Sequence, residues 1–174
     1  MPPNRFESEV ESFLEGSHGD RTHIKRADHP RLHHYAGRYC EGFIYDAFTR
    51  RKEYYAYGQV DKYSFGGADF SSASFEIFKK FAIMHFAADI RAAHQLPPLT
   101  VPPVTDAHPS FSIEFVEPIS YFLTSKASPI PTTYTSFSPA ALLPLSYLMS
   151  TPSEDLLNLV LEPSGAGYVA LFQR

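Results

Sequence analysis

Twelve of the fifteen prolines lie at Pro97 or later, and this layout divides the chain into two unlike halves. Proline lacks a backbone N–H and has a fixed φ, so helix interiors and central strands rarely contain it. The stretch 97–110 alone holds five prolines and predicts an extended, polyproline-type connection. Because 174 residues is the size of one domain, we expect a single domain, 1–174, that includes this connection.

The apolar content is sufficient for a packed core. Hydrophobic residues make up 44% of the chain, with 15 Phe and 11 Tyr, which argues against global disorder. Cys40 is the single cysteine, so no intramolecular disulfide can form. The first residues lack the apolar core of a signal peptide, and no apolar run approaches the roughly 20 residues of a membrane span. We therefore expect a cytoplasmic protein that is not embedded in a membrane.

Capping signals and apolar spacing predict the helices. Asn4 and Glu7 form a variant of the capping box and begin a helix over residues 4–16. The longest helix is expected over 72–95, before the first proline pair. It is rich in Phe and Ala and predicted to be largely buried. Plotted at 100° per residue, it has one narrow face formed by Glu76, Lys80, Ala87, Arg91 and His94.

Alternating and β-branched patterns predict the strands. Two or three antiparallel strands, roughly 38–48 and 53–60, flank a basic turn, and residues 111–115 alternate as a further strand. The apolar runs 156–161 and 168–172 flank a glycine-containing loop and suggest a β-hairpin. The sequence thus predicts an α+β fold, with an antiparallel sheet packed with one long buried helix, an N-terminal helix and a C-terminal β-hairpin.

Charge is distributed unevenly along the chain. The formal net charge is −4, which argues against simple nucleic-acid binding. Residues 17–96, however, carry a net charge of +3 and seven of the eight histidines, whereas residues 97–174 carry −4. Such asymmetry can mark a polyanion-binding region, with ordinary surface variation as the alternative.

A basic and aromatic segment is the candidate nucleic-acid site. Arg50, Arg51 and Lys52 are consecutive, and strand alternation places the nearby Tyr55 and Tyr57 on one face. Basic groups pair with phosphates while aromatic rings stack on bases. The alternative is a charged hairpin turn that blunts a sheet edge. The predicted nucleic-acid-binding residues are Arg31, Arg38, Arg50, Arg51, Lys52, Tyr55 and Tyr57.

His85 and Asp89 are the most chemically suggestive pair. Their i, i+4 spacing on the long helix lets the side chains meet, on the side that faces the core. A buried carboxylate that holds an imidazole can orient a general base, and it can equally satisfy two buried polar groups. We expect the structural role and no catalytic residue.

The histidines give no complete metal site. His29, His33 and His34 have a suitable spacing, but a zinc site needs three or four converging ligands. Neither the glutamate of a zinc hydrolase nor a cysteine partner accompanies them. We therefore expect no metal and no cofactor.

The composition carries one resemblance to a known family. Pro, Ala and Ser number 50 of 174 residues, and 29 of the 78 from Pro97 onward. Runs such as Lys126–Pro131 and Ser136–Ala141 resemble the proline-alanine-serine-rich proteins of polymycoviruses, double-stranded RNA viruses of fungi. The similarity is compositional and strongest over 97–153. It implies a protein that coats viral RNA in a host cytoplasm, and it transfers no functional residue.

These observations favour a non-enzymatic, self-associating RNA-binding protein. Its expected partners are RNA, double-stranded viral RNA in particular, and further copies of the chain, at least as a dimer. Two alternatives stay open. One is a small enzyme of lyase or isomerase type that uses a buried His85–Asp89 pair. The other is a scaffold whose proline-rich segment recruits partners.

Overall fold

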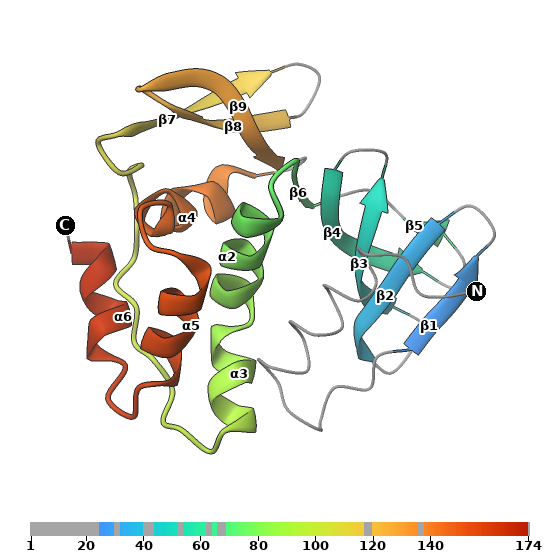
Figure 1. Cartoon of the computed structure of the whole chain (residues 1–174), viewed down its shortest axis with the longest axis horizontal. Coiled ribbons are helices and arrows are strands. Elements are labelled where there is room, and N and C mark those ends of the chain that lie inside the picture. Colours follow the sequence, from blue (N-terminus) through green and yellow to red (C-terminus); the bar gives the residue numbers. More distant parts are fainter. Residues whose placement is uncertain are drawn as a thin grey trace.

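The computed structural model describes these ranges of the chain: 25–29, 32–39, 44–51, 54–61, 64–65, 69–116, 120–135 and 138–173. Side chains are described for Tyr55, Tyr57, 69–116, 120–128 and 138–173. The N-terminal helix expected over 4–16 lies outside these ranges. Within them the α+β class is confirmed, because an antiparallel sheet packs against a group of helices (Figure 1).

The described strands form one sheet of nine. They are β1 (Lys25–His29), β2 (Leu32–Tyr39), β3 (Ile44–Arg51), β4 (Tyr54–Asp61), β5 (Ser64–Phe65), β6 (Phe70–Ser72), β7 (Phe111–Val116), β8 (Ser120–Ser125) and β9 (Ser128–Thr135). Their order is β1-β2-β3-β4-β6-β9-β8-β7, with β5 pairing beside β4, and every pair is antiparallel. Pairing of β6 with β9 joins the N-terminal strands to the later β7–β9 group, which lies above the helices in Figure 1.

The predicted strands are present with shifted bounds. Three strands, β2 to β4, correspond to the two or three expected over 38–48 and 53–60, and β2 begins earlier than expected. β3 continues to Arg51 and β4 starts at Tyr54, so the expected turn residues Arg50 and Arg51 belong to a strand. The strand expected at 111–115 is confirmed as β7.

The helices are α2 (Phe75–His85), α3 (Ala87–Ala93), α4 (Leu142–Leu148), α5 (Ser153–Leu161) and α6 (Ala166–Ala170), with short 3₁₀ turns η2 (Pro139–Ala141) and η3 (Leu171–Gln173). The single long helix expected over 72–95 is therefore wrong in its continuity. Phe86, at φ −101° and ψ 12°, leaves the helical region and separates α2 from α3. At the start of α2, Ser74 caps the helix by accepting a hydrogen bond from the Ile77 amide.

The expected C-terminal β-hairpin is wrong. Residues 153–161 and 166–170 form α5 and α6 instead. Leu156 and Val160, four residues apart, are both fully buried, as on the inner face of a helix. Glu154 and Asp155 in the first turn of α5 favour the helix dipole. Apolar runs of five or six residues suit a strand and a helix alike, and here helix packing decides between them.

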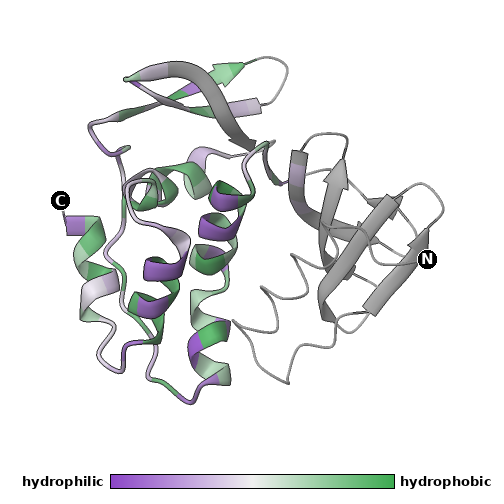
Figure 2. Cartoon of the chain, in the orientation of Figure 1, coloured by the Kyte–Doolittle hydropathy of each residue, from purple (hydrophilic) through white to green (hydrophobic). Residues whose placement is uncertain are grey.

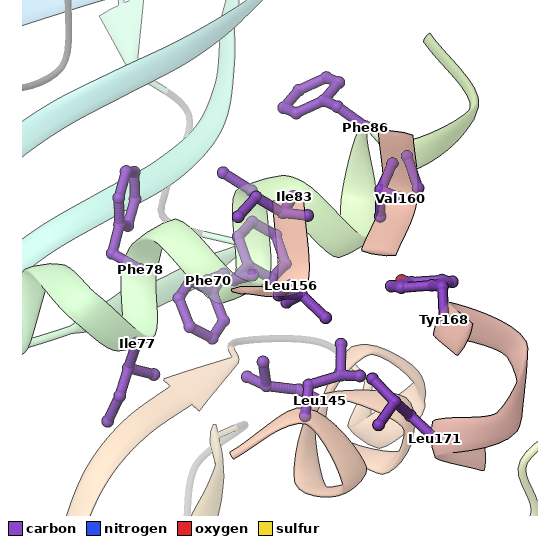
Figure 3. Close-up of a cluster of buried hydrophobic side chains, with 14 of the residues drawn as sticks. Phe70, Ile77, Phe78, Ile83, Phe86, Leu145, Leu156, Val160, Tyr168 and Leu171 are labelled. Atoms are coloured by element: carbon purple, nitrogen blue, oxygen red, sulfur yellow. The ribbon is translucent and has the colours of Figure 1, made fainter. Parts of the chain in front are cut away.

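The core lies mainly among the helices, and the strands add Tyr57, Phe70 and Leu123 to it. Figure 3 shows Phe70 of β6 between Phe78 of α2 and Leu156 of α5, with Leu145 of α4 and Leu171 below them. Phe78 is 1% exposed, which confirms that α2 is central to the fold. Among the described helices, none has the length and apolar character that crossing a bilayer requires.

Candidate functional site

The residues predicted to bind nucleic acid lie on the N-terminal strands. Arg38 belongs to β2, and Arg50 and Arg51 end β3, where Arg50 pairs with Tyr55 across the ladder. Arg31 and Lys52 fall outside the described residues. The structure therefore places the two tyrosines as side chains and the arginines only as strand positions.

Both tyrosines face α2 rather than an open surface. Tyr57 is 5% exposed, and its ring lies 5.4 Å from that of Phe81. Tyr55 is half-buried, with its ring 4.9 Å from the ring of Phe75. The two share one face, as alternation predicts, but it is the core face. Because the Tyr57 ring is almost completely covered by the core, a nucleic-acid base cannot stack on it.

His85 is exposed at the end of α2, where a buried side chain was expected. Its Nε2 shares a hydrogen bond of 3.0 Å with the Tyr57 hydroxyl. Asp89 is half-buried on α3, beyond the helix break at Phe86. The His85 ring lies at the edge of the aromatic core, 5.4 Å from the ring of Phe81 and 4.8 Å from that of Tyr57. A catalytic role for His85 and Asp89 stays a prediction.

Three charged residues of the polar face predicted for the long helix, Glu76, Lys80 and Arg91, hold neighbouring helices in place. Glu76 accepts hydrogen bonds from the Ser153 amide (2.6 Å) and hydroxyl (2.8 Å) at the start of α5. Lys79 adds an ion pair at 2.9 Å. Burial raises the pKa of Glu76, but the hydrogen bonds from Lys79 and Ser153 outweigh it and lower the pKa to about 2. The ionised carboxylate thus anchors α5 to α2.

Two buried cations complete this arrangement at helix C-termini. Lys80 is 6% exposed and donates to the Met149 carbonyl, just beyond α4, at 2.7 Å. Burial lowers the pKa of Lys80 from its ordinary value. Arg91 is 1% exposed and donates to the backbone carbonyls of Val160 and Glu162 at the end of α5. A cation at a helix C-terminus meets the carbonyls that the helix leaves unpaired.

The exposed apolar surface concentrates on β7. Phe115 is 54% exposed and Val116 46%, and the end of β7 is coloured as hydrophobic in Figure 2. The Phe115 ring lies 5.2 Å from that of Tyr121 on β8. Phe111 and Ile113, at the start of the strand, pack against the core. β7 is therefore anchored at one end and exposed at the other, where an interacting surface can form.

β7 is also an end strand of the sheet. In the described sheet it pairs with β8 alone. An end strand presents backbone N–H and C=O groups on its open side, which another chain can pair with. The alternating pattern at 111–115 predicts the strand, but its place at the sheet end depends on long-range pairing of β6 with β9, which no local pattern reveals.

The described surface is acidic. Eight described side chains are Asp or Glu and four are Lys or Arg. Two of these cations, Lys80 and Arg91, are buried on carbonyls, and Lys79 is paired with Glu76. Lys126 is the exposed one of the four. The exposed acids are Asp106, Glu114, Glu154, Asp155 and Glu162. A surface of this sign attracts a basic partner.

Within the described part of the chain, no three His, Cys, Asp or Glu side chains gather so that they could hold a metal ion. The side chains of His29, His33 and His34 are outside that part.

Comparisons with known proteins identify the family. The sequence model of the family Immunity protein 61 matches residues 19–168. Among solved structures, Rv3902c from M. tuberculosis superposes with a TM-score of 0.67 at 16% sequence identity, covering 91% of this chain and 90% of that chain. This likeness shows a shared fold. A comparison with curated protein sequences yields no match.

The family match overturns the resemblance to polymycovirus proteins and, with it, the viral RNA-coating function. The physical reason is that a composition of Pro, Ala and Ser does not record their order. The described parts of the two runs include ordinary folded elements. Pro129 and Pro131 lie in β9, and Ser138 caps the 3₁₀ turn η2 by accepting a hydrogen bond from the Ala140 amide. By the match over residues 19–168, the chain belongs to the Immunity protein 61 family.

Proposed function

We propose that this chain protects a cell from a toxin by binding the toxin as an immunity protein. The observation that carries the proposal is the family match, which extends over most of the chain. The partner is therefore a protein, where the sequence alone favoured RNA. The cytoplasmic location expected from the sequence is part of this proposal.

The surface supports a protein partner. A stable protein interface buries about 800 Å² on each side, which is roughly a twelfth of this chain's accessible surface of 10146 Å². Such interfaces have an apolar centre and a polar rim. Phe115 and Val116 on β7 offer an apolar centre, and the nearby Glu114 offers a charged rim.

Neutralisation also sets the affinity that the complex needs. A toxin that acts at nanomolar concentration is blocked only when the Kd is nanomolar or lower, about −12 kcal/mol. The acidic surface favours fast encounter with a basic toxin, because complementary charge raises association rates. We expect this rate to fall as salt is added.

Co-expression tests the proposal in cells. A candidate toxin from the same organism is induced with and without the chain, and growth is followed. The proposal expects the chain to restore growth and to co-purify with the toxin. It expects no protection against an unrelated toxin, which is the specificity control. A folded, well-expressed chain that neither restores growth nor co-purifies with the toxin would refute the proposal.

A further inference from the structure

The hydrogen bonds at the base of β7 identify which backbone groups face its open side. The Lys126 amide donates to the Ser110 carbonyl at 3.0 Å, so the carbonyl of Ser110, one residue before β7, faces the β8 side. In an antiparallel pair such residues alternate with residues whose backbone groups point away. The β7–β8 register continues without a shift, so the backbone N–H and C=O groups of Ser112, Glu114 and Val116 face β8. The backbone groups of Phe111, Ile113 and Phe115 face the open side of β7.

The backbone N–H of Phe111, the first of these three residues, already has a hydrogen-bond acceptor. The Phe111 amide donates to the His108 carbonyl at 2.8 Å. Ile113 and Phe115 follow it, and no described strand lies on that side of β7. Their N–H and C=O groups are spaced to pair with one additional strand. The exposed ring of Phe115 stands at the same position and adds apolar contact to the backbone bonds.

The charge of Glu114 on β7 determines whether a second copy of the chain or a different protein pairs with its open side. An antiparallel second copy that paired through Ile113 and Phe115 would place Glu114 directly opposite its own counterpart. Like charges that are directly opposite across a ladder are destabilising. A strand with Lys or Arg at that position would instead be stabilised by Glu114. Across the described part of the chain acidic side chains outnumber basic ones, which also favours a basic protein over a second copy.

We propose that the open side of β7 receives an edge strand of the toxin, with a basic residue facing Glu114 and apolar contact on Phe115. This inference rests on the proposed function and adds the surface and the chemistry of the partner. The self-association expected from the sequence then does not use this edge.

Substitutions on β7 test the inference, with toxin binding measured by calorimetry on purified proteins. Phe115→Ala removes the ring and should weaken binding roughly tenfold or more, as truncated aromatic anchors do. Phe115→Pro also removes the outward N–H, and an end strand accepts proline at such a position. It should weaken binding at least as much. Glu114→Lys should also weaken binding, and its effect should be larger at low salt than at high salt.

Matched controls change similar chemistry elsewhere. Val101→Ala shortens another exposed apolar side chain, which is 38% exposed, and should change affinity by no more than about twofold. Glu154→Lys reverses one exposed charge on α5 and should slow association slightly without a loss comparable to that of Glu114→Lys. Circular dichroism and melting temperature establish that each variant is folded.

The outcomes separate the two proposals. If the unchanged chain binds no toxin, the proposed function fails and the β7 inference fails with it. If the unchanged chain binds and folded Phe115→Pro and Glu114→Lys bind equally well, the function stands and β7 is overturned as the surface. A dimer of the unchanged chain that Phe115→Pro converts to a monomer would also overturn it, because a second copy would then occupy the edge. Weaker binding confined to the β7 variants supports the inference.

Discussion

Arg91→Met should be one of the most destabilising substitutions in the helical layer. The guanidinium is 1% exposed and donates to four backbone carbonyls, at 2.5 Å for Pro97, 2.6 Å for Val160, 2.7 Å for Glu162 and 3.0 Å for Pro163. These bonds tie the end of α3 to the end of α5 and to the proline-rich connection. Methionine fills much of the same volume and donates nothing, so the carbonyls lose this donor.

The magnitude follows from the hydrogen bonds lost. Each bond from a charged donor contributes about 1.5–3 kcal/mol, but burial of the guanidinium offsets part of the total. We expect Arg91→Met to lower the free energy of unfolding by roughly 3–5 kcal/mol. For a chain of this length, that corresponds to a fall in melting temperature on the order of 10 °C.

Chemical denaturation of both variants and a control measures the effect. Arg91→Lys keeps the charge but not the fork of donors, so its loss should be intermediate. The control Lys79→Met removes a cation from a partly exposed ion pair and should cost less than about 1 kcal/mol. An unfolding free energy for Arg91→Met within about 1 kcal/mol of the unchanged chain would refute this account of the helical layer.

Three further substitutions probe the core, the α2–α5 anchor and a tight turn. Phe78→Ala should lower the free energy of unfolding by roughly 3–5 kcal/mol, because it opens a cavity where the side chain is 1% exposed. Glu76 has a folded pKa of about 2 against an ordinary 4.5, so its stabilisation is complete above about pH 4.5 and is lost as the pH falls toward 2. Its side chain is 44% exposed, so screening should limit the effect to roughly 1 kcal/mol, and Glu76→Gln should melt increasingly like the unchanged chain on acidification. Gly165→Ala should lower the melting temperature, because Gly165 has φ +62° and an added Cβ would lie 2.0 Å from Leu99 Cδ2.

Local pattern was sufficient to predict the fold class and the position of several strands. Alternation of Phe111, Ile113 and Phe115 predicts β7, and the structure has a strand over 111–116. The aromatic spacing of the long helix correctly predicts burial of Phe78 and Phe81. Both predictions succeed because a period of two or of about 3.6 residues is a property of the segment itself.

Other features depend on partners distant in the sequence. Lys80 and Arg91 fall on the polar side of a helical plot, yet both are buried, because the ends of α4 and α5 supply carbonyl acceptors. No proline or glycine lies at the helix break at Phe86, so the sequence does not predict the break. The apolar runs of α5 and α6 predict strands as readily as helices, because their length suits either element.

The candidate site was missed for a related reason. The basic and aromatic residues Arg50, Arg51 and Tyr57 predict a nucleic-acid site, but Tyr57 belongs to the core. Phe115 and Glu114 look like ordinary strand residues in the sequence. Their interest comes from the place of β7 at the end of the sheet, which only the assembled topology shows.

The most direct test of the central claim is a titration of the purified toxin with this chain, with the activity of the toxin as the readout. The account predicts that activity falls linearly and reaches its floor near one equivalent of the chain, as tight stoichiometric binding requires. A chain carrying Phe115→Pro should need a clear excess to reach the same floor. Toxin activity that is undiminished at a tenfold excess of the folded, unchanged chain would contradict the claim.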